Sequence, residues 1–143
     1  MSKELTVFVI GEREFAIDSH AVCDVRDWAP AMTLPHRPRH IQSVIPVDGL
    51  VVPLIDMSLK LGLGRADPCK RHAVVLVRLG SRVIALLVDE VQPPIAVEPA
   101  RLQPVAGPAP EKPLISGVVT LDERMICFVE LNALSGNVES EAA

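Results

Sequence analysis

The clearest fold signal in the chain is the sequence AVVLVRLGSRVIALLVD, residues 73–89. Two apolar runs rich in β-branched residues flank the pair Gly80-Ser81, an arrangement typical of a β-hairpin with a tight two-residue turn. The second run, residues 83–88, is apolar on both faces of a strand, so both faces must be covered by other parts of the protein. The stretch therefore predicts a buried hairpin that ends in an acidic residue, Asp89.

The same order of strand, tight turn, strand and acidic residue occurs three more times. These copies cover residues 5–18, 44–56 and 115–130. The pair Asp48-Gly49 in the second of them is the strongest turn signal, because a type I′ turn needs positive φ at both central positions. Four such hairpins form a quasi-repeat and predict an all-β chain.

The connections between the hairpins are predicted to be short. Asp56 is the expected N-cap of one or two helical turns that end at Gly62, and residues 99–102 are expected to form a second short turn. The proline-rich residues 103–113 are expected to form an extended loop. A short C-terminal helix is expected at residues 130–134.

Four hairpins that need cover on both faces favour two small barrels packed against each other. Val, Leu and Ile number 20, 16 and 9, against three Phe and one Trp, so the core is aliphatic. We expect a single domain over residues 1–136, followed by a polar tail at 137–143. The domain is expected to divide into two intertwined halves near residues 65–72, and a return of the terminal hairpin to the first half is left open.

Composition excludes several classes of protein. An apolar content of 49% and a net charge of −4 argue against disorder. The acidic balance and scarcity of aromatic residues argue against nucleic-acid binding, and no apolar run is long enough for a membrane span. The polar N-terminus argues against export, and three widely spaced Cys fit a reducing cytoplasm. Two of them, Cys23 and Cys127, alternate with apolar neighbours and are expected to be small core residues.

The acidic residues and histidines do not suggest a catalytic or metal site. Asp56 and Asp89 end hairpins, where a cap or turn role is favoured over a catalytic pair. The four His lack a tight metal-binding spacing, and nearby prolines exclude the helix that would bring His36 and His40 together. No catalytic residue, cofactor or metal is therefore expected.

Several short motifs follow one another along the chain. They are VFVIGEREFAID at 7–18, VCDV at 22–25, Pro38 with Ile41, LVVPLIDM at 50–57, VDEV at 88–91 and the last hairpin at 115–131. Their order and spacing resemble the CheW-like chemotaxis coupling family from about Leu5 to Leu134.

The resemblance implies a fold of two small five-stranded SH3-like barrels around a shared apolar core, and a role that is not enzymatic. Members of this family link membrane chemoreceptors to a cytoplasmic histidine kinase. The implied partners are the regulatory domain of that kinase, met through apolar contacts at a barrel end, and the cytoplasmic tip of a chemoreceptor, held in a groove near Val22. The implied location is the cytoplasm, at membrane-associated receptor arrays.

The central hairpin departs from the family pattern at its turn. The usual Asn-Leu-Arg-Gly is Pro46-Val47-Asp48-Gly49 here, and the Gly that usually precedes the strand is Ser43. In the family the Arg can pair with the acid of a Val-x-Glu-Val motif, which is Asp24 in this chain. Asp48 would then face a like charge, so either the two carboxylates are separated or Arg26 replaces the lost Arg. We expect an intact fold with altered receptor affinity or choice.

The residues that the resemblance implies for receptor binding are Val22, Asp24, Val25, Ser43 and Asp48. Val22 and Val25 are either aliphatic anchors for a receptor helix or ordinary core residues. Asp24 is either a recognition charge or a solvated strand residue, and Asp48 is first of all a turn residue.

Two other functions stay open from the sequence. The altered turn also fits a coupling protein of a specialised chemosensory system, such as one that drives pilus-based motility. A function of another class is a small β-barrel that binds a ligand, which would require an apolar pocket with converging polar groups.

Overall fold

The computed structural model describes residues 2–28, 43–64, 72–104 and 114–134, and strands make up most of them. All four predicted hairpins are present. They are β1 (Lys3–Ile10) with β2 (Arg13–Asp18), β4 (Ser43–Val47) with β5 (Leu50–Asp56), β6 (Ala73–Leu79) with β7 (Arg82–Val88), and β11 (Ile115–Leu121) with β12 (Arg124–Val129).

The turn between β4 and β5 has the conformation that its sequence predicts. Asp48 has φ of 49° and Gly49 has φ of 83°, so both central residues lie in the left-handed region. This is the requirement of a type I′ turn, in which the twist of the turn matches that of the flanking strands.

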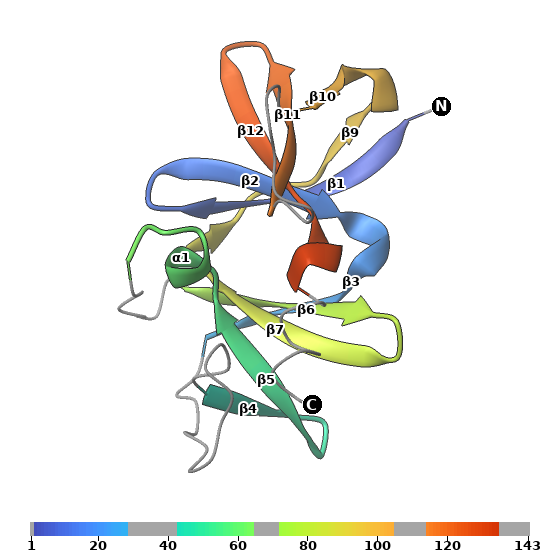
Figure 1. The fold of residues 1–143 in the computed structure, drawn as a ribbon. Helices are drawn as coiled ribbons and strands as arrows, with labels where there is room; N and C mark the ends of the chain where they lie inside the picture. Colours follow the sequence, from blue (N-terminus) through green and yellow to red (C-terminus); the bar gives the residue numbers. More distant parts are fainter. Residues whose placement is uncertain (1, 29–42, 65–71, 105–113, 135–143) are drawn as a thin grey trace.

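The strands form two sheets, which lie in two layers (Figure 1). The first half of the molecule is a seven-stranded sheet in the order β10-β11-β12-β2-β1-β8, with β9 also paired to β1. The second half is a five-stranded sheet in the order β3-β6-β7-β5-β4. The strands not yet given bounds are β3 (Val22–Asp27), β8 (Glu90–Val91), β9 (Ile95–Val97) and β10 (Leu102–Pro104).

The chain passes from one sheet to the other at two places. It leaves the first sheet at η1 (Ser19–Ala21), after β2, and returns to it after β7. The boundary expected near residues 65–72 lies almost wholly outside the described residues, and β5 and β6 on either side of it belong to the same sheet. The terminal hairpin joins the first sheet, because β12 pairs in parallel with β2.

Short helical segments connect the strands, as predicted. Asp56 caps α1 (Met57–Lys60), its carboxylate accepting a hydrogen bond from the Leu59 N–H. A 3-10 turn, η2, occupies Pro99–Arg101, and residues 131–134 are helical. Residues 102–104, whose last two fall in the predicted loop, instead form the edge strand β10. The rest of that loop, beyond residue 104, and the tail at 137–143 lie outside the described residues.

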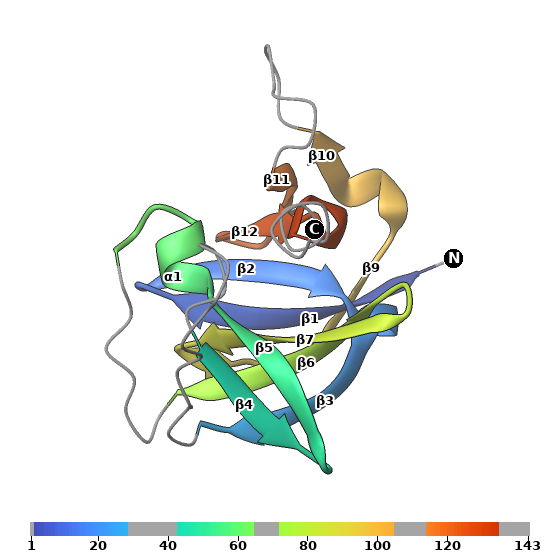
Figure 2. The same ribbon diagram turned by 60° about the horizontal axis from the view of Figure 1, so that its bottom comes forward.

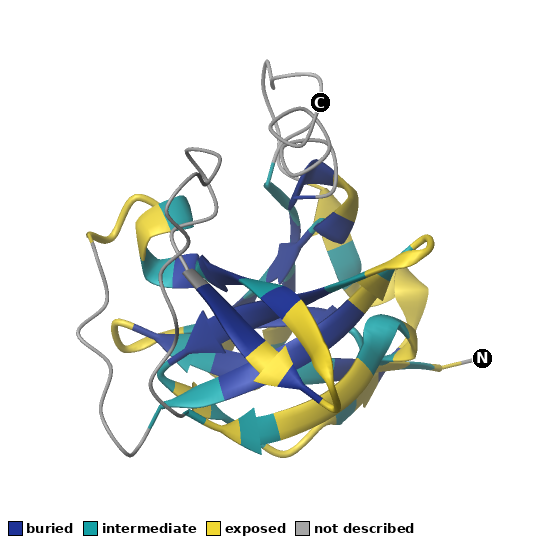
Figure 3. Cartoon of the chain, turned by 90° about the horizontal axis from the view of Figure 1, so that it is seen from below, coloured by how far each residue is buried: buried dark blue, intermediate teal, exposed yellow. Residues whose placement is uncertain are grey.

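The apolar side chains form three clusters because the central strands are apolar on both faces. One face of β6 contributes Val75 and Val77 to a central core between the two halves, and the other contributes Val74 and Leu76 to the interior of the second half. In the same way β1 contributes Phe8 to the central core and Val7 to the interior of the first half. Figure 3 shows buried residues through the middle of the molecule and exposed ones at the hairpin ends.

The predicted fold class is confirmed: the chain is all-β, with two barrel-like halves around a shared aliphatic core and short helical turns. The first half differs in strand number, with seven strands where five were expected. Three of these, β8, β9 and β10, are only two or three residues long. The central core also holds Leu131 and Leu134 of the short C-terminal helical segment.

Candidate partner-binding site

Strand β3 carries three of the five candidate residues, and a β-bulge decides which way they face. Val22 pairs with Val77 and Asp24 pairs with Leu76, so Cys23 is the extra residue on β3. Cys23 is exposed, and the prediction that it is a core residue is wrong because the bulge interrupts the alternation on which that prediction depended. Cys127, by contrast, is partly buried against the central core.

Beyond the bulge, successive residues of β3 face opposite sides of the sheet. Asp24 and Arg26 lie opposite Leu76 and Val74, whose side chains fill the second half. Val25 lies opposite Val75, on the face that carries the central core, yet it is 41% exposed because β3 is the last strand of its sheet. Val25 is thus an aliphatic residue at an accessible edge.

Val22 has a different environment from Val25. It is partly buried and packs against the central core, before the bulge. Of the two candidate anchors, Val25 is the one that offers a larger exposed fraction to a partner.

The β4–β5 hairpin supplies the other candidates. Asp48 lies in the exposed turn, whereas Ser43 begins β4 at the opposite end of the strand and pairs with Leu54. Leu50 and Val51, just after the turn, are 68% and 59% exposed. Sequence reasoning missed these two residues because an apolar run is normally a sign of core. The neighbouring Asp48-Gly49 turn was the available signal that they lie at an outer end.

Arg26 joins the two candidate acids. Its Nε donates a hydrogen bond to Asp24 Oδ2 at 2.9 Å, and its Nη2 donates one to Asp48 Oδ2 at 3.1 Å. Of the two alternatives that the sequence left open, this geometry agrees with the one in which Arg26 replaces the missing Arg of the turn. We call Asp24, Arg26 and Asp48 the charged seam.

The charged seam also links the two ends of the five-stranded sheet. β3 and β4 are its terminal strands, and Arg26 on β3 reaches the turn that follows β4. Figure 2 shows β3 and the β4–β5 hairpin at the same end of the second half. The seam thus closes this half with side chains at a point where no ladder pairing joins the described strands β3 and β4.

The contacts within the charged seam shift the pKa values of Asp24 and Arg26. The hydrogen bond from Arg26, together with that from the Val25 N–H, holds the pKa of Asp24 below its ordinary value of 3.8. The hydrogen bond to Asp24 and the charge of Asp48 raise the pKa of Arg26. Because the pKa of Asp24 is lowered in the folded state, its stabilising effect is present above pH 3.8 and is lost as the pH falls through the lowered value.

Replacing Arg26 with Gln is expected to raise the pKa of Asp24 from its lowered value towards the ordinary one. The variant removes the cation and leaves Asp24 near the carboxylate of Asp48, which disfavours ionisation. The measurement is an NMR titration of the Asp24 carboxyl carbon. Arg124→Gln is the matched control, because Arg124 pairs with Glu14 in the first half. If the pKa of Asp24 were the same in the wild type and in Arg26→Gln, the claim that Arg26 lowers the pKa of Asp24 within the charged seam would be contradicted.

The other acids that the sequence singled out make structural hydrogen bonds to the backbone. Asp56 caps α1, and Asp89 Oδ2 accepts a hydrogen bond from the Gly11 N–H in the turn between β1 and β2. Within the described ranges, no three His, Cys, Asp or Glu side chains are grouped so as to hold a metal ion. Among the same residues, no helix has the length and apolar character needed to cross a membrane.

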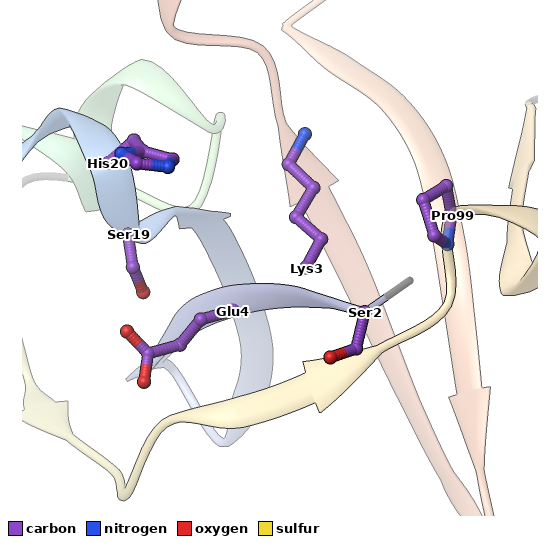
Figure 4. A pocket seen from close by; sticks show the side chains of 6 residues that line it. All are labelled: Ser2, Lys3, Glu4, Ser19, His20 and Pro99. Carbon is purple, nitrogen blue, oxygen red and sulfur yellow. The ribbon is translucent and has the colours of Figure 1, made fainter.

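A shallow hollow of about 400 Å³ lies beside β1 (Figure 4). It is lined by Ser2, Lys3, Glu4, Ser19, His20 and Pro99. The Lys3 amino group already pairs with Asp18 at 3.3 Å, and it points to the opposite side of β1 from the Glu4 carboxylate. The Ser19 hydroxyl and the Glu4 carboxylate point toward each other, but the Lys3 amino group points away from both (Figure 4), and apolar side chains fill the interiors of both halves. This geometry disfavours the ligand-binding barrel.

Comparison with known proteins identifies the family. The family model for the CheW-like domain matches residues 4–139. The chain belongs to the CheW-like domain family. This CheW-like chain is 38% identical over 143 residues to the chemotaxis protein CheW of Rhizobium meliloti, covering 99% of this chain and 92% of that one.

More distant proteins of the same name are also similar to this chain. The chemotaxis protein CheW of Klebsiella aerogenes is 25% identical over 145 residues, which cover 97% of this CheW-like chain and 85% of the relative. The crystal structure of the scaffolding protein TtCheW from Thermoanaerobacter tengcongensis superposes with a TM-score of 0.80 at 24% identity, covering 92% of this chain and 86% of that one. The last comparison shows that the two proteins share a fold.

Proposed function

We propose that this CheW-like protein is a chemotaxis adaptor in the cytoplasm that couples chemoreceptors to a histidine kinase. The match to the CheW-like domain over residues 4–139 carries this proposal. It is supported by relatives that are named chemotaxis proteins and, in one case, a scaffolding protein. The filled interiors of both halves also fit a protein that acts through its surfaces.

The receptor tip is proposed to contact β3 and the charged seam. A receptor helix needs an accessible aliphatic anchor, which Val25 provides, and a charged neighbour that selects the partner, which Asp24 and Asp48 provide. One guanidinium faces two carboxylates in the seam, so this surface keeps a negative charge and favours a basic residue on the receptor. Val22, which packs against the central core, and Ser43, at the other end of β4 from the turn, are not part of the seam and are proposed as receptor contacts from the family resemblance alone.

The kinase regulatory domain is proposed to contact the outer end of the β4–β5 hairpin. Leu50 and Val51 are both exposed there, on opposite faces of β5, and an exposed aliphatic side chain of this kind is suited to the centre of a protein interface. The two partners would thus meet adjacent parts of one rigid half. The adaptor then holds them in a fixed relative arrangement, so that a change in the receptor alters the balance between kinase states. This mechanism requires no chemistry by the chain itself.

The test is reconstitution with the cytoplasmic fragment of a chemoreceptor and the regulatory domain of the kinase from the same chemosensory system. The wild-type protein is expected to bind each partner and to form a three-component complex in sedimentation velocity. Leu50→Asp is expected to weaken kinase binding at least about tenfold while receptor binding is kept, as for loss of an apolar interface centre.

Met125→Asp is the matched control for Leu50→Asp. Met125 is 67% exposed, nearly the same as the 68% of Leu50, but it lies on β12 in the first half. Equal loss of kinase binding in both variants would contradict the proposed contact. Failure of the wild-type protein to bind either partner would contradict the adaptor function itself.

A further inference from the structure

Asp89 occupies the point at which the chain returns from the second sheet to the first. It follows β7 directly and precedes β8. Its backbone N–H donates a hydrogen bond to the carbonyl of Val9 at 3.0 Å, and its Oδ2 accepts one from the Gly11 N–H at 2.9 Å. The residue is therefore attached by both backbone and side chain to the β1–β2 hairpin of the first half.

The second oxygen of the same carboxylate contacts the other half. Oδ1 lies 3.3 Å from Nε2 of His72, which immediately precedes β6. The His72 side chain is only 13% exposed, whereas that of Asp89 is 39% exposed, so the contact joins a mostly buried imidazole to a carboxylate at the surface. One carboxylate thus bridges a turn of the first sheet and the start of a strand of the second.

The connection continues from His72 to β3. The carbonyl of His72 accepts a hydrogen bond from the N–H of Trp28 at 3.1 Å, and Trp28 directly follows the last residue of β3. Trp28 also packs against the interior of the second half. A continuous path of hydrogen bonds and one side-chain contact therefore runs from Gly11 through Asp89 and His72 to the end of the strand that carries Val25.

The central core alone does not fix where β3 lies relative to the first half. Its contacts are apolar, with the stacked rings of Phe8 and Phe15 among aliphatic side chains, and the hydrophobic effect itself is not directional. Hydrogen bonds depend strongly on distance and angle, and the Asp89 carboxylate accepts one from the first half and contacts the second. β3 depends on such a constraint because it pairs with only one strand, β6.

We propose that Asp89 is a positioning residue for β3, the strand proposed to contact the receptor. Through His72, it holds the end of β3 in a fixed position relative to the first half. The importance of this for receptor binding rests on the proposed adaptor function. The positioning itself is a property of the free protein and is tested without any partner.

The first experiment measures amide hydrogen exchange and NMR chemical shifts of the free protein. In Asp89→Ala the Gly11 amide loses its acceptor, and its exchange is expected to accelerate roughly tenfold, as for loss of a hydrogen bond to a charged group. Amide shifts of β3 and Trp28 are expected to move as well. Glu90→Ala is the matched control, because it removes a neighbouring exposed carboxylate and is expected to change neither readout.

Two further variants separate the contact of Asp89 with Gly11 from its contact with His72. Asp89→Asn keeps an oxygen for the Gly11 N–H and is expected to restore slow exchange there, and it also serves if Asp89→Ala does not fold. His72→Ala is expected to shift the amides of β3 while leaving Gly11 exchange slow. Its effect on β3 is expected to be smaller when it is added to Asp89→Ala than in the wild type, because both changes break one path.

The receptor fragment supplies the functional readout. Asp89→Ala is expected to bind it about fivefold or more weakly, as for the loss of a coupled contact, with kinase-domain binding unchanged. Unchanged β3 shifts in Asp89→Ala, or purely additive effects of Asp89→Ala and His72→Ala, would overturn the positioning role. Absence of receptor binding by the wild-type protein would instead overturn the adaptor function. The hydrogen-exchange and chemical-shift results would still test the positioning role, because they are measured on the free protein.

Discussion

Replacing Phe8 with Ala is expected to lower the free energy of unfolding by about 3–5 kcal/mol, which is the usual effect of truncating a buried aromatic residue. Phe8 is completely buried, and its ring stacks on that of Phe15 with centroids 6.1 Å apart. Both rings belong to the central core, where side chains of the two halves meet. The cavity would therefore lie at the junction of both halves.

Urea unfolding followed by circular dichroism measures this effect. Because the two halves share one core, the variant is expected to unfold in a single transition, with a melting temperature lower by roughly 10 °C. Met125→Ala is the control: its side chain is 67% exposed, and the expected change is within about 0.5 kcal/mol. Two separate transitions in the Phe8 variant, or a loss below about 1 kcal/mol, would contradict a shared core.

Replacing Val25 with Glu is expected to weaken binding of the chemoreceptor fragment at least about tenfold. Burying an aliphatic side chain of this size contributes about 1.5–3 kcal/mol, and the new carboxylate would also lie next to Asp24. Because Val25 is 41% exposed at the edge of its sheet, the free energy of unfolding is expected to change little. Isothermal titration calorimetry and thermal melting of the same samples measure the two quantities.

Two comparison variants test whether the loss of receptor affinity is specific to position 25. Met125→Glu introduces the same charge at an exposed position of the first half and is expected to leave receptor affinity unchanged. Val22→Glu places a charge against the central core and is expected to lower the melting temperature. Receptor affinity that is equal for wild type and Val25→Glu would show that β3 is not the receptor surface.

The hairpins were predictable from the sequence because local chemistry determines them. Asp48 and Gly49 both adopt the positive φ that their residue types tolerate, and the runs on either side pair without an offset. The two-faced apolar character of residues 83–88 likewise predicted a strand covered on both sides, and its residues divide between the central core and the interior of the second half. Short-range patterns sufficed for these features.

The remaining features depend on contacts between distant parts of the chain. The bulge at Cys23 inserts one residue into a strand, and a two-residue alternation gives no sign of it. The strands β8 and β9 pair with β1 over only two and three residues, so their own sequences carry little signal. In the candidate site, Arg26 was recognisable as a possible substitute cation, but the exposure of Leu50 and Val51 depends on the tertiary position of the hairpin.

The way the two sheets divide the chain has a consequence for its synthesis. Every described strand of the second sheet lies within residues 22–88, so this half can form once that segment has left the ribosome. The first sheet instead joins strands from distant parts of the chain, as in the pairing of Arg124 with Glu14, 110 residues apart. Until β12 arrives, the edge of β2 has no partner, and the inward side chains of β1 and β2 are uncovered. That interval is when a nascent chain of this protein is most prone to aggregate, and when a chaperone would be of most use to it.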